Sequence, residues 1–197
     1  MIDCTLHIKK YLKLLENKLS VLDIQQINQI VNILKTAYDN ENTIFAMGNG
    51  GSGTTASHLV CDFNRGASTG SVKKFKVISL NDNVPSISAI ANDISYDAIF
   101  EEQLKNFLRP GDVVLGISVS GNSKNIIRAI EYANKHGATT IGLCGFDGGK
   151  LKKTAQYLIH VKVDDMKVAE DIHSIISHVL MKMLGAALIK EKYKKRK

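Results

Sequence analysis

Apolar residues recur at helical spacing over the first 40 residues, where positions three and four apart are hydrophobic and the rest are polar. This period is typical of amphipathic helices and predicts two of them. The first is indicated by Leu6, Ile8, Tyr11, Leu12, Leu14 and Leu15, and the second by Ile24, Ile27, Ile30, Val31, Leu34 and Ala37.

Beyond residue 41 the period changes, and short apolar runs alternate with longer helical segments. We predict strands over residues 42–47, 75–80, 112–117, 139–143 and 157–161. Helices are expected over about 54–65, within 84–107 (one or two), from 124 to about 136 and over about 168–190.

The alternation of strands and helices predicts the fold class. Dense apolar runs are typical of parallel strands that are buried on both faces. We therefore expect one α/β domain, a doubly wound sheet between two helical layers (a three-layer αβα sandwich). Its parts are an N-terminal helical part at 1–40, the α/β core at 41–190 and a basic tail at 191–197.

Composition adds few constraints. Hydrophobic residues make up 44% of the chain, the first residues lack the pattern of a signal peptide, and no apolar run is long enough to span a membrane, so we expect a cytoplasmic protein. The net charge of +7 lies largely in residues 190–197. We interpret these as a solvated tail, with no nucleic-acid or membrane partner. The three cysteines lack CxxC spacing, which argues against a disulfide framework or a thiolate zinc site, and Cys61 is interpreted as a small buried hydrophobe.

Two loops follow predicted strands and lead into helices. In the first, Gly48, Gly50 and Gly51 allow a tight turn, and Asn49 and Ser52 add polar side chains. The second, residues 118–123, contains three serines, Ser118, Ser120 and Ser123. Such loops present hydroxyls and free N–H groups at a helix N-terminus, which is the chemistry of a phosphate site. Ordinary turns with helix caps would use the same residue types, but two such loops after buried strands favour phosphate binding.

A nucleotide cofactor is not expected. The glycines at 48, 50 and 53 fit GxGxxG, but the acidic residue required about 20 residues later is replaced by Ser68-Thr69-Gly70. No Walker loop is present either.

These motifs, in this order, resemble the sugar isomerase (SIS) domain family, and within it the phosphoheptose isomerases. The residues that carry the resemblance are the loop at 48–52, His58, Ala91-Asn92-Asp93, the loop at 116–123, residues 145–150 and the last helix with His173 and His178. The resemblance implies a five-stranded parallel sheet, a homotetramer and isomerisation of sedoheptulose 7-phosphate to D-glycero-D-manno-heptose 7-phosphate. It implies a substrate site at Asn49, Gly50, Gly51, Asn92, Asp93, Ser118, Val119, Ser120 and Ser123.

Isomerisation through an enediol needs a general base and an acid. His58 and Asp62 are four residues apart and therefore share one face of a helix, a spacing that suits metal ligands. The resemblance places a zinc ion on His58, Asp62, Glu170 and His178, makes Asp62 the catalytic base and His178 its acid/base partner, and brings Asp62 and Glu170 to the substrate. The family pattern has Glu at position 62 and Gln at 170, so this chain departs from it twice.

A regular helix between Glu170 and His178 would rise about 12 Å. Both can reach one ion only if Glu170 precedes the helix or if the site is shared between subunits. Two other functions remain open: a non-catalytic SIS protein that senses a sugar phosphate or binds a protein, and an isomerase for a different sugar phosphate. Retention of His58, Asp62 and His178 favours the enzyme.

Overall fold

The computed structural model describes residues 2–67 and 73–194, with the backbone alone for 189–194. Five parallel strands form one sheet in the order β2-β1-β3-β4-β5. They are β1 (Thr43–Gly48), β2 (Lys76–Ser79), β3 (Val113–Ser118), β4 (Thr139–Cys144) and β5 (Tyr157–His160). The predicted five-stranded parallel sheet is confirmed. The Ser68-Thr69-Gly70 segment lies outside the described residues.

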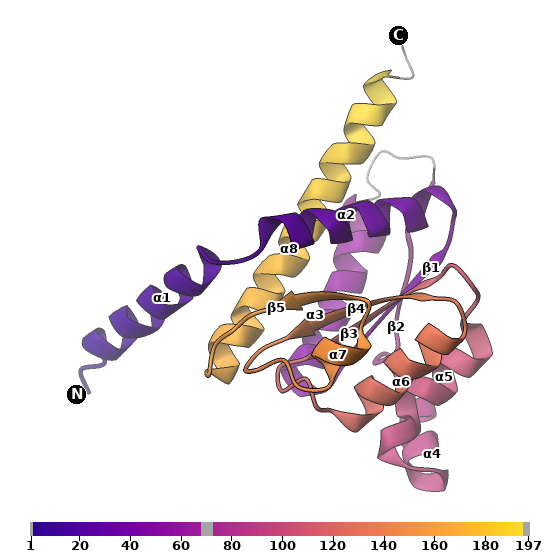
Figure 1. Ribbon diagram of the computed structural model, residues 1–197, viewed down its shortest axis with the longest axis horizontal. Coiled ribbons are helices and arrows are strands. Elements are labelled where there is room, and N and C mark those ends of the chain that lie inside the picture. Colours follow the sequence, from indigo (N-terminus) through magenta and orange to yellow (C-terminus); the bar gives the residue numbers. More distant parts are fainter. Residues whose placement is uncertain (1, 68–72, 195–197) are drawn as a thin grey trace.

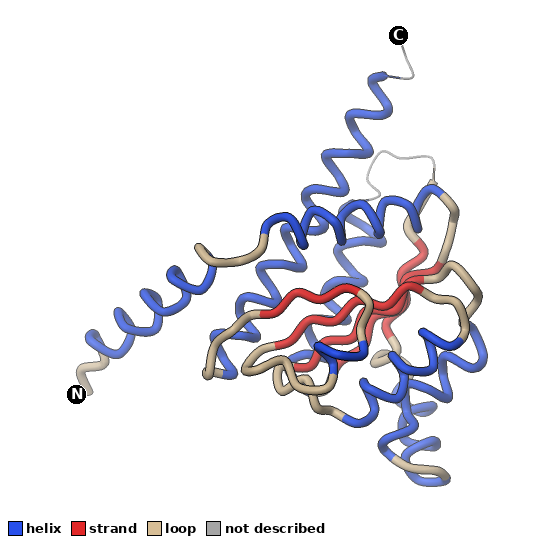
Figure 2. The backbone as a smooth tube through the Cα atoms, in the orientation of Figure 1, coloured by secondary structure: helices blue, strands red, loops and turns tan. Residues whose placement is uncertain are grey.

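Helices cover both faces of the sheet (Figure 1). On one face lie α2 (Ile24–Asp39), α3 (Gly50–Cys61) and α8 (Met166–Lys194). On the other lie α4 (Val84–Asp93), α5 (Ile99–Phe107), α6 (Lys124–Lys135) and α7 (Leu151–Thr154), with the short 3₁₀ helix η2 (Tyr96–Ala98) between α4 and α5. Figure 2 shows the resulting three layers, with the sheet in red between the helices.

The central strands are buried on both sides. In β1, Ile44 and Ala46 pack into the core beneath α2, α3 and α8, while Phe45 and Met47 pack toward α5 and α6. Side chains of a strand alternate between the two faces, so one continuous apolar run supplies both cores. This is why the strand runs carried no alternating pattern.

One buried carboxylate fixes the amino edge of the sheet. Asp112, 3% exposed, accepts hydrogen bonds from the backbone N–H of Thr43 (2.8 Å) and of Arg109 (2.9 Å). These bonds tie the start of β1 to the start of β3 and so set their register, in which Gly48 pairs with Ile117 at the opposite edge. The loops that follow β1 and β3 therefore emerge together.

Helix α1 (Thr5–Leu19) projects from the body (Figure 1). Its apolar residues Leu6, Ile8 and Leu12 are exposed. Tyr11 links α1 to α8, since its hydroxyl donates to Asp171 Oδ2 at 2.5 Å, and this bond raises the pKa of Tyr11 to about 12.

Two expectations need correction. Helix α8 begins at Met166 and continues to Lys194, so it extends past the boundary expected at residue 190; residues 195–197 of the basic tail lie outside the described part. Cys61 is exposed at the end of α3, whereas Cys144 in β4 is the buried cysteine. Within residues 2–67 and 73–194, no helix is both long and apolar enough to cross a membrane.

Candidate active site

The loops after β1 and β3 are joined by side-chain hydrogen bonds. Asn49, which precedes α3, and Asn125, in the first turn of α6, exchange two bonds between their amides, each 2.9 Å long. Tyr96 donates its hydroxyl to Asn49 Oδ1 at 3.0 Å. The two predicted phosphate loops therefore form one unit at the carboxyl edge of the sheet, where ligands bind in open α/β folds.

Glycines are required at the tightest points of both loops. A Cβ on Gly48 would lie 2.4 Å from the backbone carbonyl carbon of Ser52, because the first turn of α3 folds directly over the end of β1. Gly121 has φ +63° and a Cβ there would lie 2.0 Å from the carbonyl oxygen of Gly148. Both positions exclude any side chain.

Three serine hydroxyls converge in the second loop. Ser118 Oγ lies 3.5 Å from Ser120 Oγ and 3.2 Å from Ser123 Oγ. Ser123 directly precedes α6, whose first N–H groups add further donors. Hydroxyls and helix N–H groups in this arrangement can bind an oxyanion without a cation. Val119, between the serines, is 7% exposed, and its carbonyl accepts from Gly145 N–H.

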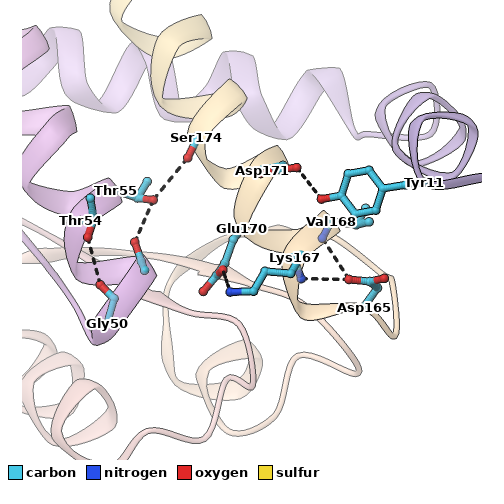
Figure 3. Close-up of polar contacts among 11 residues, drawn as sticks. Tyr11, Gly50, Thr54, Thr55, Asp165, Lys167, Val168, Glu170, Asp171 and Ser174 are labelled. Carbon is cyan, nitrogen blue, oxygen red and sulfur yellow. Dashed lines mark hydrogen bonds and ion pairs between the residues drawn. The ribbon is translucent and has the colours of Figure 1, made fainter. Parts of the chain in front are cut away.

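In the first loop, the start of α3 lies against a carboxylate from α8. A Cβ on Gly51 would lie 2.6 Å from Glu170 Oε1, so Glu170 reaches the first turn of α3 (Figure 3). Lys167 Nζ binds Glu170 Oε2 at 2.9 Å. The carboxylate therefore lies near the positive end of the helix dipole, with a lysine beside it. Ser52, also expected to bind substrate, is buried here at 6% exposure.

Farther along the same two helices, three ligand-type side chains converge. His58 Nε2 lies 3.1 Å from His178 Nε2 and 3.3 Å from Asp62 Oδ2, and His178 Nε2 lies 3.6 Å from that same oxygen. All three atoms are within 4.8 Å of one another. Asp62 Oδ2 is buried, and among the described residues it has no hydrogen-bond partner.

The local backbone places Asp62 at this point. Helix α3 ends at Cys61, and the chain continues as a π-helix, η1 (Asp62–Ala67), which is anchored by the fully buried Phe63 and packs against α8. A π-helical turn is wider than an α-helical one and is frequent at functional sites. The spacing of His58 and Asp62 predicted a shared face, but the π-helix was not predicted.

The three atoms fit a metal ion of the zinc type. Two ligand atoms bound tetrahedrally to zinc at about 2.0–2.1 Å lie about 3.3 Å apart. The observed separations of 3.1, 3.3 and 3.6 Å bracket that value. Two imidazoles and one carboxylate are also the donor set of many catalytic zinc sites. An unpaired buried carboxylate oxygen facing two histidines supports this interpretation.

Glu170 does not join this group in the chain. It lies within α8, eight residues before His178, and the continuous helix separates the two by about 12 Å. The possibility that Glu170 precedes the helix is therefore wrong. Of the two explanations offered by the sequence, only a site shared between subunits is left for Glu170 as a ligand.

Asn92 and Asp93 end α4, on the other face of the sheet. Both are exposed, and Asn92 Nδ2 donates to Asp93 Oδ1 at 2.8 Å. The segment that follows them reaches the site, because Tyr96 contacts Asn49. Their predicted role in substrate binding stays a prediction.

His173, on the buried side of α8, is 1% exposed. Burial lowers its pKa from 6.5 to about 4, so the imidazole is neutral near pH 7. It is part of the core and is separate from the group formed by His58, Asp62 and His178.

Several residues of the site were not predicted from the sequence. Asn125 and Tyr96 hold Asn49, and Thr55, Ser174 and Ser177 lie between the first loop and the histidines. Asn125 could have been noticed in the sequence, because it is a polar residue beside Ile126 and Ile127 in a helix expected to pack on the sheet. Nothing in the hydrophobic periodicity around Tyr96 indicated that it contacts Asn49.

Comparison with known proteins shows related sequences. Residues 8–145 match the SIS domain family. A probable phosphoheptose isomerase of Thermoplasma acidophilum is 38% identical over 176 residues, which cover 89% of this chain and 96% of that protein. The phosphoheptose isomerase of Clostridium acetobutylicum is 36% identical, with 86% of each chain covered.

Solved structures of phosphoheptose isomerases are similar to this chain. The phosphoheptose isomerase of Neisseria gonorrhoeae superposes with a TM-score of 0.83 at 26% identity, and 91% of this chain and 95% of that one are covered. The phosphoheptose isomerase of Francisella tularensis, at 23% identity and a TM-score of 0.85, shares the fold.

Proposed function

This chain belongs to the SIS domain family, and from that premise we propose that it is a phosphoheptose isomerase, which converts sedoheptulose 7-phosphate to D-glycero-D-manno-heptose 7-phosphate. The observation that carries the proposal is the convergence of His58, Asp62 and His178 on one point. The similarity to the relatives extends over most of the chain. His58 also lies on α3, the helix that begins at the first of the two loops.

The chemistry is a proton transfer between neighbouring carbons. Asp62 takes a proton from C1 of the ketose as the C2 oxygen gains one from His178 Nδ1, the ring nitrogen that is not assigned to zinc, and an enediol forms. The C1 hydroxyl then returns its proton to His178 while Asp62 delivers a proton to C2, which yields the aldose. Asp62 Oδ2 faces both imidazoles, so Oδ1 is the oxygen available for the transfer.

We propose zinc as the cofactor, held by His58 Nε2, Asp62 Oδ2 and His178 Nε2. When bound, such an ion supplies a Lewis acid that polarises the carbonyl oxygen. Separations close to those of a tetrahedral site support the assignment. Where the family pattern has Glu, the shorter Asp62 reaches the histidines from the first residue of the π-helix.

The phosphate is assigned to the two joined loops. Ser118, Ser120 and Ser123 supply hydroxyls, and Asn49, Gly50 and Gly51 supply the start of α3. Eight residues of helix separate Gly50 from His58, about 12 Å. A sugar phosphate that lies along α3 can therefore place its phosphate at the loops and its carbonyl end at the histidines.

We further propose a homotetramer with shared sites, in the cytoplasm. The distance between Glu170 and His178 supports sharing, because Glu170 would act on a neighbouring subunit's ion or on the substrate phosphate end. Exposed apolar residues on α1, among them Leu6, Ile8 and Leu12, offer an assembly surface. The location follows from the substrate, since a phosphomonoester does not cross a membrane unaided.

The test is incubation with sedoheptulose 7-phosphate and chromatographic separation of the two heptose phosphates. We expect conversion by the purified protein, loss of conversion after chelation, and recovery with zinc. Conversion that survives complete chelation would remove zinc from the proposal. Binding of the heptulose without turnover would support the sugar-phosphate sensor instead, and turnover of another sugar phosphate alone would change the substrate.

A further inference from the structure

Helices α3 and α8 face each other along a series of paired residues. Gly51 lies against Glu170, Thr55 Oγ1 lies 3.4 Å from Ser174 Oγ, and His58 lies 3.1 Å from His178. The partners on α8 are spaced by four residues, about 6 Å per step. The middle pair, Thr55 and Ser174, whose contact Figure 3 shows, therefore lies between the phosphate loops and the acid/base group.

A cavity of ≈ 170 Å³ opens at this middle position. Each residue that lines it carries a polar group, either a hydroxyl from one of the two helices or an imidazole. The residues are Thr54, Thr55, His58, Ser174, Ser177 and His178. A cavity of this size with convergent polar groups suits part of a polyol chain.

Among the residues that line the cavity, Ser177 contributes a hydroxyl without a partner in the described part of the chain. The side chain is 1% exposed, and its Oγ lacks a hydrogen-bond partner within residues 2–67 and 73–194. Thr55, at 7% exposure, donates to the Gly51 carbonyl at 3.2 Å, and with Ser174 Oγ 3.4 Å away it keeps one lone pair free to accept. Buried hydroxyls are normally paired, so Ser177 Oγ has the capacity to form a hydrogen bond with a group bound beside it.

We propose that Thr55, Ser174 and Ser177 form a subsite for the hydroxyls of the sugar's middle carbons, and that this subsite selects long-chain sugar phosphates. The inference rests on the proposed function, because it takes the phosphate end and the carbonyl end from it. A chain anchored at both ends must pass the cavity. Hydroxyls on its middle carbons can pair with Ser177 Oγ and can donate to the remaining lone pair of Thr55 Oγ1.

The experiment compares two ligands of different length on the same variants. One is sedoheptulose 7-phosphate, by its KM and kcat, and the other is inorganic phosphate, by its competitive inhibition constant. Ser177→Ala and Thr55→Val should each raise the KM about threefold to tenfold, the effect of one hydrogen bond. The kcat should stay within about twofold, and the inhibition constant of phosphate should not change, because phosphate needs only the loops.

Two matched variants serve as controls. Thr55→Ser keeps the hydroxyl and should restore the wild-type KM. Thr36→Val removes an equivalent helix hydroxyl from α2, one that donates to the Asn32 carbonyl at 3.0 Å, and should change neither constant. Circular dichroism of each variant verifies the fold, and Thr55→Val replaces Ser177→Ala if the latter does not fold.

An unchanged KM in both Ser177→Ala and Thr55→Val would overturn the inference and leave the isomerase function in place. A phosphate inhibition constant that rises together with the KM would also overturn it, since the hydroxyls would then act through the shape of the loops. A wild-type protein without activity on the heptulose would remove the proposed function, and the subsite with it.

Discussion

Asn49 and Asn125 exchange two amide hydrogen bonds of 2.9 Å across the carboxyl edge of the sheet. Asn49 belongs to the loop after β1, and Asn125 is 1% exposed in the first turn of α6. The pair holds the two loops at one separation. The proposed phosphate binding by both loops would depend on that separation, because a hydrogen-bond donor that is displaced binds its acceptor less well.

The first prediction concerns this pair. Asn125→Ala leaves Asn49 Nδ2 without its acceptor, while Oδ1 keeps the bond from Tyr96, and should lower the free energy of unfolding by about 1–3 kcal/mol. We also expect a higher KM for the heptulose and a higher inhibition constant for phosphate. Chemical denaturation and steady-state kinetics measure both effects. The control is Asn106→Ala, which removes an exposed amide from α5, and wild-type kinetics in Asn125→Ala would contradict the positioning role.

The acid/base assignment gives the second prediction. Asp62→Asn and His178→Ala should each lower kcat at least about a hundredfold, because each removes a group that transfers a proton. Circular dichroism should match the wild type. His136→Ala, which removes a histidine bonded to the Tyr132 carbonyl at the C-terminal end of α6, should keep its activity. Near-normal kcat in either active-site variant would show that the protons move through other groups.

Ser120 provides the third prediction. Ser120→Ala removes a hydroxyl that points at Ser118 and accepts from the Asn122 N–H at 3.2 Å. The loss should raise the KM several-fold, the effect of one hydrogen bond to a charged oxygen, and leave kcat nearly unchanged. Kinetics with sedoheptulose 7-phosphate provide the check, and an unchanged KM would exclude a phosphate contact.

The fourth prediction contrasts two glycines. Gly51→Ala places a methyl group against the flexible end of Glu170, which can move aside, so the melting temperature should stay close to that of the wild type. Gly121→Ala forces a left-handed conformation and meets the backbone of Gly148, which should cost about 2–4 kcal/mol. Thermal melts compare the two. Equal loss of stability would mean that α3 and α8 approach more rigidly than the contact with Glu170 indicates.

The fifth prediction is a pH dependence. The pKa of His173 falls to about 4 on folding from 6.5, so between these values the unfolded chain binds a proton that the folded chain does not. Stability should therefore decrease as the pH falls from about 6.5 to about 4, by up to about 3 kcal/mol. His173→Leu removes this contribution, and its unfolding free energy should depend less on pH in that window. Parallel curves for the two proteins would show that His173 is accessible to protons in the folded state.

The sequence by itself determined the layers of the fold. The runs 44–47 and 113–117 are short and carry no polar side chain, a pattern typical of strands buried on both faces, so the parallel sheet was predictable. Glycine and serine loops after those strands also pointed to phosphate chemistry. The spacing of His58 and Asp62 placed two ligands on one helix face.

Only the tertiary structure decided which residues meet. His178 is 120 residues from His58, and helical periodicity carries no information about contacts between distant helices. The π-helix that begins at Asp62, the pairing of Asn49 with Asn125 and the unpaired Ser177 hydroxyl all depend on how α3, α6 and α8 pack. Glu170 illustrates the same point. The resemblance to the family suggested that it is a metal ligand, but in the structure one continuous helix separates it from His178 and its carboxylate lies against Gly51 in the first loop.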